Sequence, residues 1–243
     1  MRAARAPRAC HPLDPTVLIL AFDTSTDTVA VALLRDGTPA RQPIHLGPAP
    51  DGTPRAAESL VPLLTEMLRE QRIGVADLDL VVVGTGPGSF VGLRAGLAVA
   101  KGLALGSRVP VVGVPSLAAL CAAADRTEAE SAIAVVDARR GELFVASYRT
   151  DEEPVAVLEP FAASAPAAAR RCRLVLGNGP VVLVGNATSA LIAELEPPSR
   201  VASPAILTPP PDALARLGAA LFRARGPDDV GRLEPLYGRP PVG

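Results

Sequence analysis

Short apolar runs alternate with polar turns along the first half of the chain. The run Val17–Phe22 is apolar throughout, which is typical of a strand buried on both faces. A polar turn follows it, and a second apolar run at Val29–Leu34 ends in the hairpin signal Asp36-Gly37. We expect a third strand at Ala40–Leu46, before a loop rich in proline and glycine at 47–55.

Two longer segments carry helical spacing. One apolar stripe predicts a helix at Ala56–Arg69, and its residues are Leu60, Val61, Leu64, Met67 and Leu68. A buried strand is predicted at Asp79–Val83, and a glycine-rich turn leads from it into a helix at Ser89–Leu105. A fifth strand at Val109–Val114 precedes a short helix, for which Ser116 is the expected N-cap.

The pattern then starts again, which indicates an internal duplication. The apolar strand Ala132–Asp137 ends in an aspartate, as the first strand does, and a turn leads to a return strand at Glu142–Tyr148. Val29 and Leu143 occupy matching places in the two return strands. We interpret the two halves as copies of one α/β unit. The alternative is that a strand–aspartate–turn–strand pattern recurs by chance.

These elements predict two lobes. We expect an N-terminal lobe at 16–108 and a C-terminal lobe at 109–243, after a disordered extension at 1–15. The last predicted helix is Asp212–Arg225, which Asp212 caps and Gly226 ends. We expect this helix to pack back on the N-terminal lobe.

Composition narrows the function classes. Of the 243 residues, 49% are hydrophobic and 20% charged, so the chain can bury a core. A formal net charge of −1 and an aromatic content of 3% argue against a protein that binds nucleic acid by itself. Three scattered cysteines form no disulfide framework or metal motif, which favours a cytoplasmic location. No run of about 20 apolar residues predicts a membrane span.

Three polar residues, Asp23, Thr24 and Ser25, follow the first strand. In an actin-like phosphotransferase, an aspartate at this place holds a metal and the hydroxyls face phosphate. The alternative is an aspartate that bonds the backbone of its own turn. Asp137 ends the matching strand, and the two carboxylates would serve a nucleotide kinase only if both face one ligand.

Three glycines, Gly84, Gly86 and Gly88, lie where a strand passes into a helix. Free amides and the helix dipole at such a place suit an anion. The loop lacks the lysine of a phosphate-binding Walker motif and does not match a dinucleotide fingerprint. A tight turn that brings two elements close together is the other interpretation, and both stay open.

The helix after this loop has three interior glycines, Gly92, Gly96 and Gly102. Together they cost about 3 kcal/mol relative to alanine, which close packing can offset. The approaching element is either part of the same chain or a helix of another subunit. For the second alternative, we expect an interface made by both long helices with Arg94 as its polar anchor. Its residues would be Leu60, Val61, Leu64, Met67, Leu68, Val91, Gly92, Arg94, Ala95, Gly96 and Val99.

Several motifs together resemble the bacterial TsaB (YeaZ) family. They are LAFDTST at 20–26, GTGPGSFVGLR at 84–94, GVPS at 113–116 and DARRGE at 137–142. EPLY at 234–237 also resembles the end of the family's sequences. The resemblance implies an α/β, two-lobed, duplicated actin-like fold (ASKHA, ribonuclease H-like).

The resemblance also implies a non-catalytic dimerisation subunit. Its partner would be a TsaD-like paralogue, which transfers a threonylcarbamoyl group to the adenosine beside the anticodon of tRNAs that read ANN codons. A TsaE-like ATPase would join the pair, tRNA would be reached only through the complex, and the isolated chain would form a homodimer. No metal or cofactor is expected. We expect at most a vestigial nucleotide or phosphate site that binds ATP or ADP weakly. Its residues would be Asp23, Thr24, Ser25, Gly84, Gly86, Gly88 and Asp137.

The sequence departs from the catalytic relatives on its first predicted helix. Relatives of the TsaD type carry a pair of metal-binding histidines there, and this sequence has none between Ala56 and Arg69. One alternative function is an actin-like ATPase or small-molecule kinase that uses Asp23, Asp137 and the loop at Gly84. Another is a self-sufficient homodimer with a regulatory role.

Overall fold

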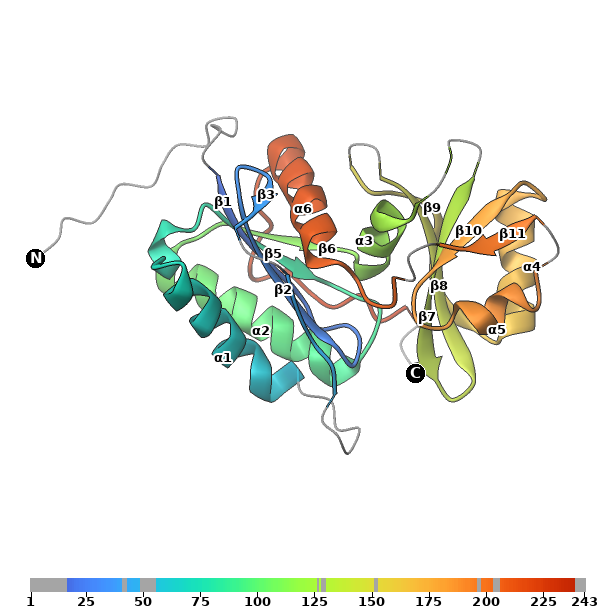
Figure 1. Ribbon diagram of the computed structural model, residues 1–243, viewed down its shortest axis with the longest axis horizontal. Helices are drawn as coiled ribbons and strands as arrows, with labels where there is room; N and C mark the ends of the chain where they lie inside the picture. The colour runs from blue at the N-terminus through green and yellow to red at the C-terminus, as the bar shows by residue number, and fades with distance from the viewer. Residues whose placement is uncertain are drawn as a thin grey trace, which may run out of the picture.

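The structure is a computed structural model that describes residues 17–40, 43–48, 56–125, 127, 130–150, 153–195, 198–202 and 206–238. Within these residues the chain forms two β-sheets, each with helices on both sides (Figure 1). The extension expected at 1–15 and most of the loop expected at 47–55 lie outside them.

The first sheet has six strands. They are β1 (Leu18–Asp23), β2 (Val29–Arg35), β3 (Thr38–Pro39), β4 (Ile44–Leu46), β5 (Leu80–Gly84) and β6 (Val111–Val114). Their order is β3-β2-β1-β5-β6, and β4 also pairs with β2. Strand β4 lies within the third strand expected at Ala40–Leu46, but that prediction began it too early and missed β3, which pairs with β2 at another point.

The second sheet has five strands in the order β11-β10-β7-β8-β9. They are β7 (Ser131–Arg139), β8 (Glu142–Arg149), β9 (Val155–Ala163), β10 (Val181–Val184) and β11 (Ser199–Val201). Read from β9, this order repeats that of the first sheet, with the central strand antiparallel to one neighbour and parallel to the other. The repeat confirms the predicted duplication, and the arrangement is the two-lobed actin-like fold.

Helices separate and flank the two sheets. They are α1 (Ala56–Glu70), α2 (Phe90–Ser107), α3 (Ser116–Ala123), α4 (Ala165–Leu176), α5 (Thr188–Ile192) and α6 (Pro211–Arg225), with a 3-10 turn η1 (Val75–Asp77). The pair α1 and α2 covers the outer side of the first sheet, and α4 and α5 cover the outer side of the second (Figure 1). Between the sheets lie α3 and α6, so the molecule has five layers.

Burial on both faces explains the uninterrupted apolar runs. In β1, Leu18, Leu20 and Phe22 join the outer core with α1 and α2. Ile19 and Ala21 point the other way, into the central core with α3 and α6. Successive strand residues face opposite sides of a sheet, so a strand between two helical layers needs apolar residues at every position.

The expected lobe boundary at 108/109 is wrong. Strand β6 pairs with β5 in the first sheet, since the crossover through α2 returns the chain to a parallel neighbouring strand. The chain leaves this lobe only at α3, which packs on β7 and β8. Helix α6 lies on the first sheet, as expected, and a Cβ at Gly218 would come within 2.4 Å of the Val82 side chain.

Two predicted helix caps are misplaced. Pro115 occupies the N-cap of α3, so Ser116 is the first helical residue and its hydroxyl is free for a distant partner. Pro210 occupies the N-cap of α6, and Asp212 lies inside the first turn, where it pairs with Arg216 at 3.0 Å. Gly226 ends α6 as predicted, with a φ of 78°.

Candidate functional site

Asp23 ends β1 in a fully buried hydrogen-bond network. One carboxylate oxygen accepts from the backbone N–H of Ser25 at 2.8 Å and from the Ser25 hydroxyl at 2.6 Å. The other accepts from the Ser116 hydroxyl at 2.5 Å. Burial raises the pKa of Asp23 above its ordinary value, against the lowering effect of these hydrogen bonds. The prediction of an aspartate that bonds its own turn is confirmed, and Ser116 is a partner that the sequence did not reveal.

The glycine loop is packed against this turn. A Cβ at Gly84 would lie 1.8 Å from the Asp23 carboxylate, and a Cβ at Gly88 would lie 2.1 Å from the Ser25 carbonyl oxygen. The Gly86 N–H donates to Ser116 at 2.9 Å. The loop therefore makes the tight turn of the second interpretation. At Gly84, Gly86 and Gly88 the chain's own atoms lie where a Cβ would stand, so these glycines permit close approach.

The C-terminal segment after α6 closes over the same loop. The Leu236 N–H donates to the Thr85 carbonyl at 2.8 Å. A Cβ at Gly238 would lie 2.8 Å from Pro87 and 3.0 Å from the ring of Phe144 in β8. The segment thus reaches from the first lobe to the second, and it adds a further layer over the buried aspartate network.

Asp137 lies in different surroundings from Asp23. It is exposed, and its carboxylate accepts from the Arg139 N–H at 2.8 Å and pairs with the Arg139 guanidinium at 3.5 Å. Arg139 also forms an ion pair with Asp27 of the first hairpin, which joins the two lobes. The kinase alternative, in which Asp23 and Asp137 face one ligand, finds no support here, because Asp23 is enclosed and Asp137 is bound in its own turn.

No metal site emerges from the described part of the chain. No group of three or more histidine, cysteine, aspartate or glutamate side chains there is placed to hold an ion. Asp23, the residue that the sequence suggested for a metal, has both oxygens occupied by protein donors. Asp23, Thr24, Ser25 and the loop glycines therefore do not fit a metal–nucleotide site in this conformation.

Many residues expected at a partner interface lie in the core instead. Leu60, Leu64, Met67 and Leu68 are buried between α1 and the first sheet. The stripe that they form is the core-facing side of an amphipathic helix, which has the same spacing as an interface stripe.

The glycines of α2 divide by what they face. A Cβ at Gly92 would lie 2.0 Å from the Thr24 carbonyl oxygen, and one at Gly96 would lie 2.4 Å from the Thr24 hydroxyl. The Thr24 hydroxyl also donates to the Gly92 carbonyl at 2.7 Å. These two glycines serve packing within the chain, so their assignment to a partner interface is wrong. Gly102 has nothing within 4 Å of a Cβ position.

An apolar surface remains on the outside of α1 and α2. Of the expected interface residues, Val61, Val91 and Arg94 are exposed, and Ala95 and Val99 are half-buried. We call the stripe Val91, Ala95, Ala98, Gly102 and Leu105 the outward face of α2. Sequence reasoning missed Ala98 and Leu105, although spacing of seven residues from Val91 places them on the same side. Val91 is 64% exposed and Leu105 is 78% exposed.

Helix α2 is also long and apolar enough to cross a membrane by length and composition. Its inner side packs on β5, β1 and β6, with Leu93 and Leu97 in the core. The apolar character thus comes from two sides, one covered by the sheet and one outward.

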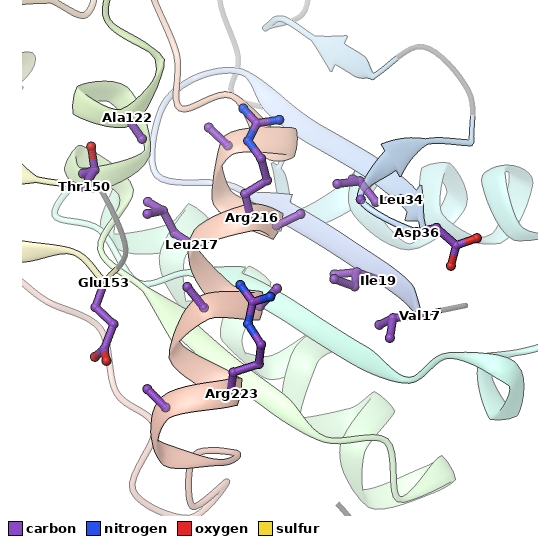
Figure 2. Close-up of a pocket in the computed structure, with 16 residues that line it drawn as sticks. Val17, Ile19, Leu34, Asp36, Ala122, Thr150, Glu153, Arg216, Leu217 and Arg223 are labelled. Carbon is purple, nitrogen blue, oxygen red and sulfur yellow. The ribbon is translucent and has the colours of Figure 1, made fainter. Parts of the chain in front are cut away.

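A cavity of about 970 Å³ runs along α6. Val17, Ile19, Leu34 and Asp36 line it on one side of the helix, and Ala122, Thr150 and Glu153 on the other, with Arg216 and Arg223 rising between them (Figure 2). Val17 precedes β1 and Asp23 ends it, so the cavity and the buried aspartate lie at opposite ends of that strand. None of the candidate residues from the sequence lines this cavity.

Comparison with known proteins agrees with the predicted family. The family model "TsaD: tRNA N6-adenosine threonylcarbamoyltransferase" matches residues 49–173, just over half of the chain. TsaB of Escherichia coli is 36% identical over 150 residues, which cover 58% of this chain and 62% of that protein. TsaB of Haemophilus influenzae is 35% identical over 127 residues, covering 52% and 51%. The matches thus span between half and two thirds of these relatives.

A solved structure extends the similarity to nearly the whole fold. YeaZ from Pseudomonas aeruginosa is 25% identical, with a TM-score of 0.74 over 91% of this chain and 99% of that one. The chain therefore belongs to the TsaB (YeaZ) family, within the group described by the threonylcarbamoyltransferase model.

Proposed function

We propose that this chain is a non-catalytic scaffold subunit in the biosynthesis of threonylcarbamoyladenosine in tRNA. The relatives at 35–36% identity are named for that process. The observation that carries the non-catalytic role is the Asp23 network, in which protein donors occupy both carboxylate oxygens. Asp23 is 1% exposed, so in this conformation the protein encloses its carboxylate and does not present it to a metal or a nucleotide.

The proposed partner is the catalytic TsaD-like paralogue, which would transfer the threonylcarbamoyl group to the adenosine beside the anticodon. The outward face of α2 supports this, because small residues allow a second helix to approach closely and exposed apolar area favours association. A TsaE-like ATPase would join the pair, tRNA would bind only through the complex, and the isolated chain would self-pair. The assembly would work in the cytoplasm.

Copurification of the full chain with the TsaD-like subunit tests the proposal. We expect a stable complex at micromolar concentration, and Ala98→Trp should weaken it because the indole would obstruct helix approach. Ala224→Trp, on the exposed side of α6, is the matched control and should bind as wild type. Absence of any complex with the wild-type chain would contradict the proposal. Gly96→Leu is unsuitable, since it would collide with Thr24 in the same chain.

The alternative of an actin-like ATPase or kinase has less support. It needs Asp23 and Asp137 to face one ligand, and it needs an open glycine loop. Calorimetry of the isolated chain with Mg-ATP separates the two functions. We expect weak binding or none and no turnover. Tight binding with steady hydrolysis would favour the enzyme.

A further inference from the structure

A second exposed surface lies beside the N-terminus of α2. It is made by Phe90 (52% exposed), Val91, Arg94, Leu236 (40%) and Tyr237 (42%), and we call it the aromatic patch. The chain has five phenylalanines, two tyrosines and no tryptophan, and the other tyrosine, Tyr148, is buried. Exposed aromatic side chains are therefore rare in this protein, and two of them meet here.

The patch is held in one arrangement by contacts from two distant parts of the chain. The Arg94 guanidinium carbon lies 3.9 Å from the centroid of the Phe90 ring. The Phe90 and Tyr237 rings are 5.7 Å apart with an interplanar angle of 30°. A hydrogen bond from the Leu236 N–H to the Thr85 carbonyl, at 2.8 Å, holds the C-terminal segment beside the helix. Such preorganisation lowers the entropic cost of binding a partner.

The charge of the patch points to the chemistry of that partner. No carboxylate in the described part of the chain pairs with Arg94, whose guanidinium rests on an apolar ring. Arginine beside exposed aromatic residues is the composition of binding hot spots between proteins. A carboxylate that approached Arg94 there would find a cation oriented in advance and partly shielded from water.

We propose that the aromatic patch binds a segment of the catalytic subunit that places a carboxylate on Arg94 and aliphatic side chains against Phe90 and Tyr237. This inference rests on the proposed function. It extends the partner surface beyond the outward face of α2 to the C-terminal segment. A stacked nucleobase fits less well, because the guanidinium already covers the Phe90 ring and the protein's net charge is −1.

Affinity of the full chain for the purified catalytic subunit, at low and high salt, tests the inference. Arg94→Met keeps the stem and removes the charge, and Tyr237→Ala removes the ring. We expect each to weaken binding about tenfold or more, as truncation of a hot-spot residue does. Arg94→Met should also reduce the dependence of affinity on salt, because the ion pair is gone.

Matched controls isolate the patch. Arg170→Met, at an exposed arginine of α4, and Tyr237→Phe, which keeps the ring, should bind as wild type. The variants change exposed side chains, and unchanged thermal unfolding of each would show that the fold is intact.

Three results would overturn the inference. If Ala98→Trp weakens the complex while Arg94→Met and Tyr237→Ala bind normally, the inference is wrong and the proposed function stands. If the wild-type chain forms no complex, both fail together. If Tyr237→Ala instead weakens binding of tRNA to the isolated chain and leaves subunit affinity unchanged, the patch serves nucleic acid.

Discussion

Asp23 connects three segments that are far apart in the sequence. Its carboxylate joins the first hairpin through Ser25 and the start of α3 through Ser116, while Gly84 leaves room for it in β5. A buried carboxylate that keeps all its hydrogen-bond donors costs the fold little. Loss of one donor leaves an unsatisfied acceptor away from water, which lowers the stability of the fold. The residue thus acts in this fold as a structural connection.

Ser116→Ala should lower the free energy of unfolding by about 1–3 kcal/mol, because one Asp23 oxygen and the Gly86 N–H lose their partner. Urea unfolding of the isolated chain measures this. Ser189→Ala, at an exposed helical position, should change stability little. Equal effects of the two substitutions would show that the network contributes nothing.

Substitution by alanine should change the free energy of unfolding in opposite directions at two glycines. Gly88→Ala puts a Cβ against the Ser25 carbonyl oxygen and should cost at least about 2 kcal/mol through overpacking. Gly102→Ala meets open space in a helix and should stabilise the chain by up to about 1 kcal/mol. Denaturant midpoints of both variants decide this, and destabilisation by Gly102→Ala would contradict the assignment of that glycine to the outward face.

At the scale of elements, an ion pair links the short edge strand β11 to the connection before β7. Strand β11 is at the edge of the second sheet, and its Arg200 binds Glu130 in the turn before β7 at 2.7 Å. The Arg200 side chain, followed by the Thr127 N–H, lowers the pKa of Glu130 from 4.5 to about 2. This ion pair joins β11, a strand of only three residues, to the connection that precedes β7.

The Glu130 pair should make stability depend on pH below 4.5. The depressed pKa means that the carboxylate contributes stability above pH 4.5 and loses this contribution as pH falls towards 2. Wild type should therefore exceed Glu130→Gln in unfolding free energy at pH 6, and the difference should shrink with acidification. Chemical denaturation across this range measures it. A constant difference would mean that the ion pair contributes nothing.

At the scale of the whole molecule, the C-terminal segment connects parts that the two sheets leave separate. Leu233 is buried, and its methyl group would lie 2.6 Å from a Cβ at Gly113 in β6. Asp228 accepts from the Gly113 N–H at 2.8 Å, and Gly238 reaches Phe144 in the second lobe. The segment therefore holds the edge of the first sheet and contacts the second.

Leu233→Ala should lower stability by about 2–4 kcal/mol, because it leaves a cavity over β6. It should also speed amide hydrogen exchange of Leu236, whose N–H is bonded to Thr85. Leu207→Ala, at a leucine that is exposed, is the control. Normal exchange at Leu236 in the Leu233 variant would show that the segment is held independently of that side chain.

The sequence by itself determined the local layout. Uninterrupted apolar runs and helical spacing depend on neighbouring residues. They therefore located β1, β2, α1 and α2 to within a few residues and indicated the repeated half. The hydrogen bond between Asp23 and its own turn could also be predicted from the sequence, because Ser25 is only two residues away.

Only the tertiary structure decided what covers each apolar face. The stripe with Leu60 and Leu64 has the same spacing whether a sheet or a partner lies against it, and the structure places the sheet there. Ser116 is 93 residues from Asp23, and Tyr237 meets Phe90 from the opposite end of the chain. Contacts of this kind arise from packing between distant segments, and no local pattern specifies them.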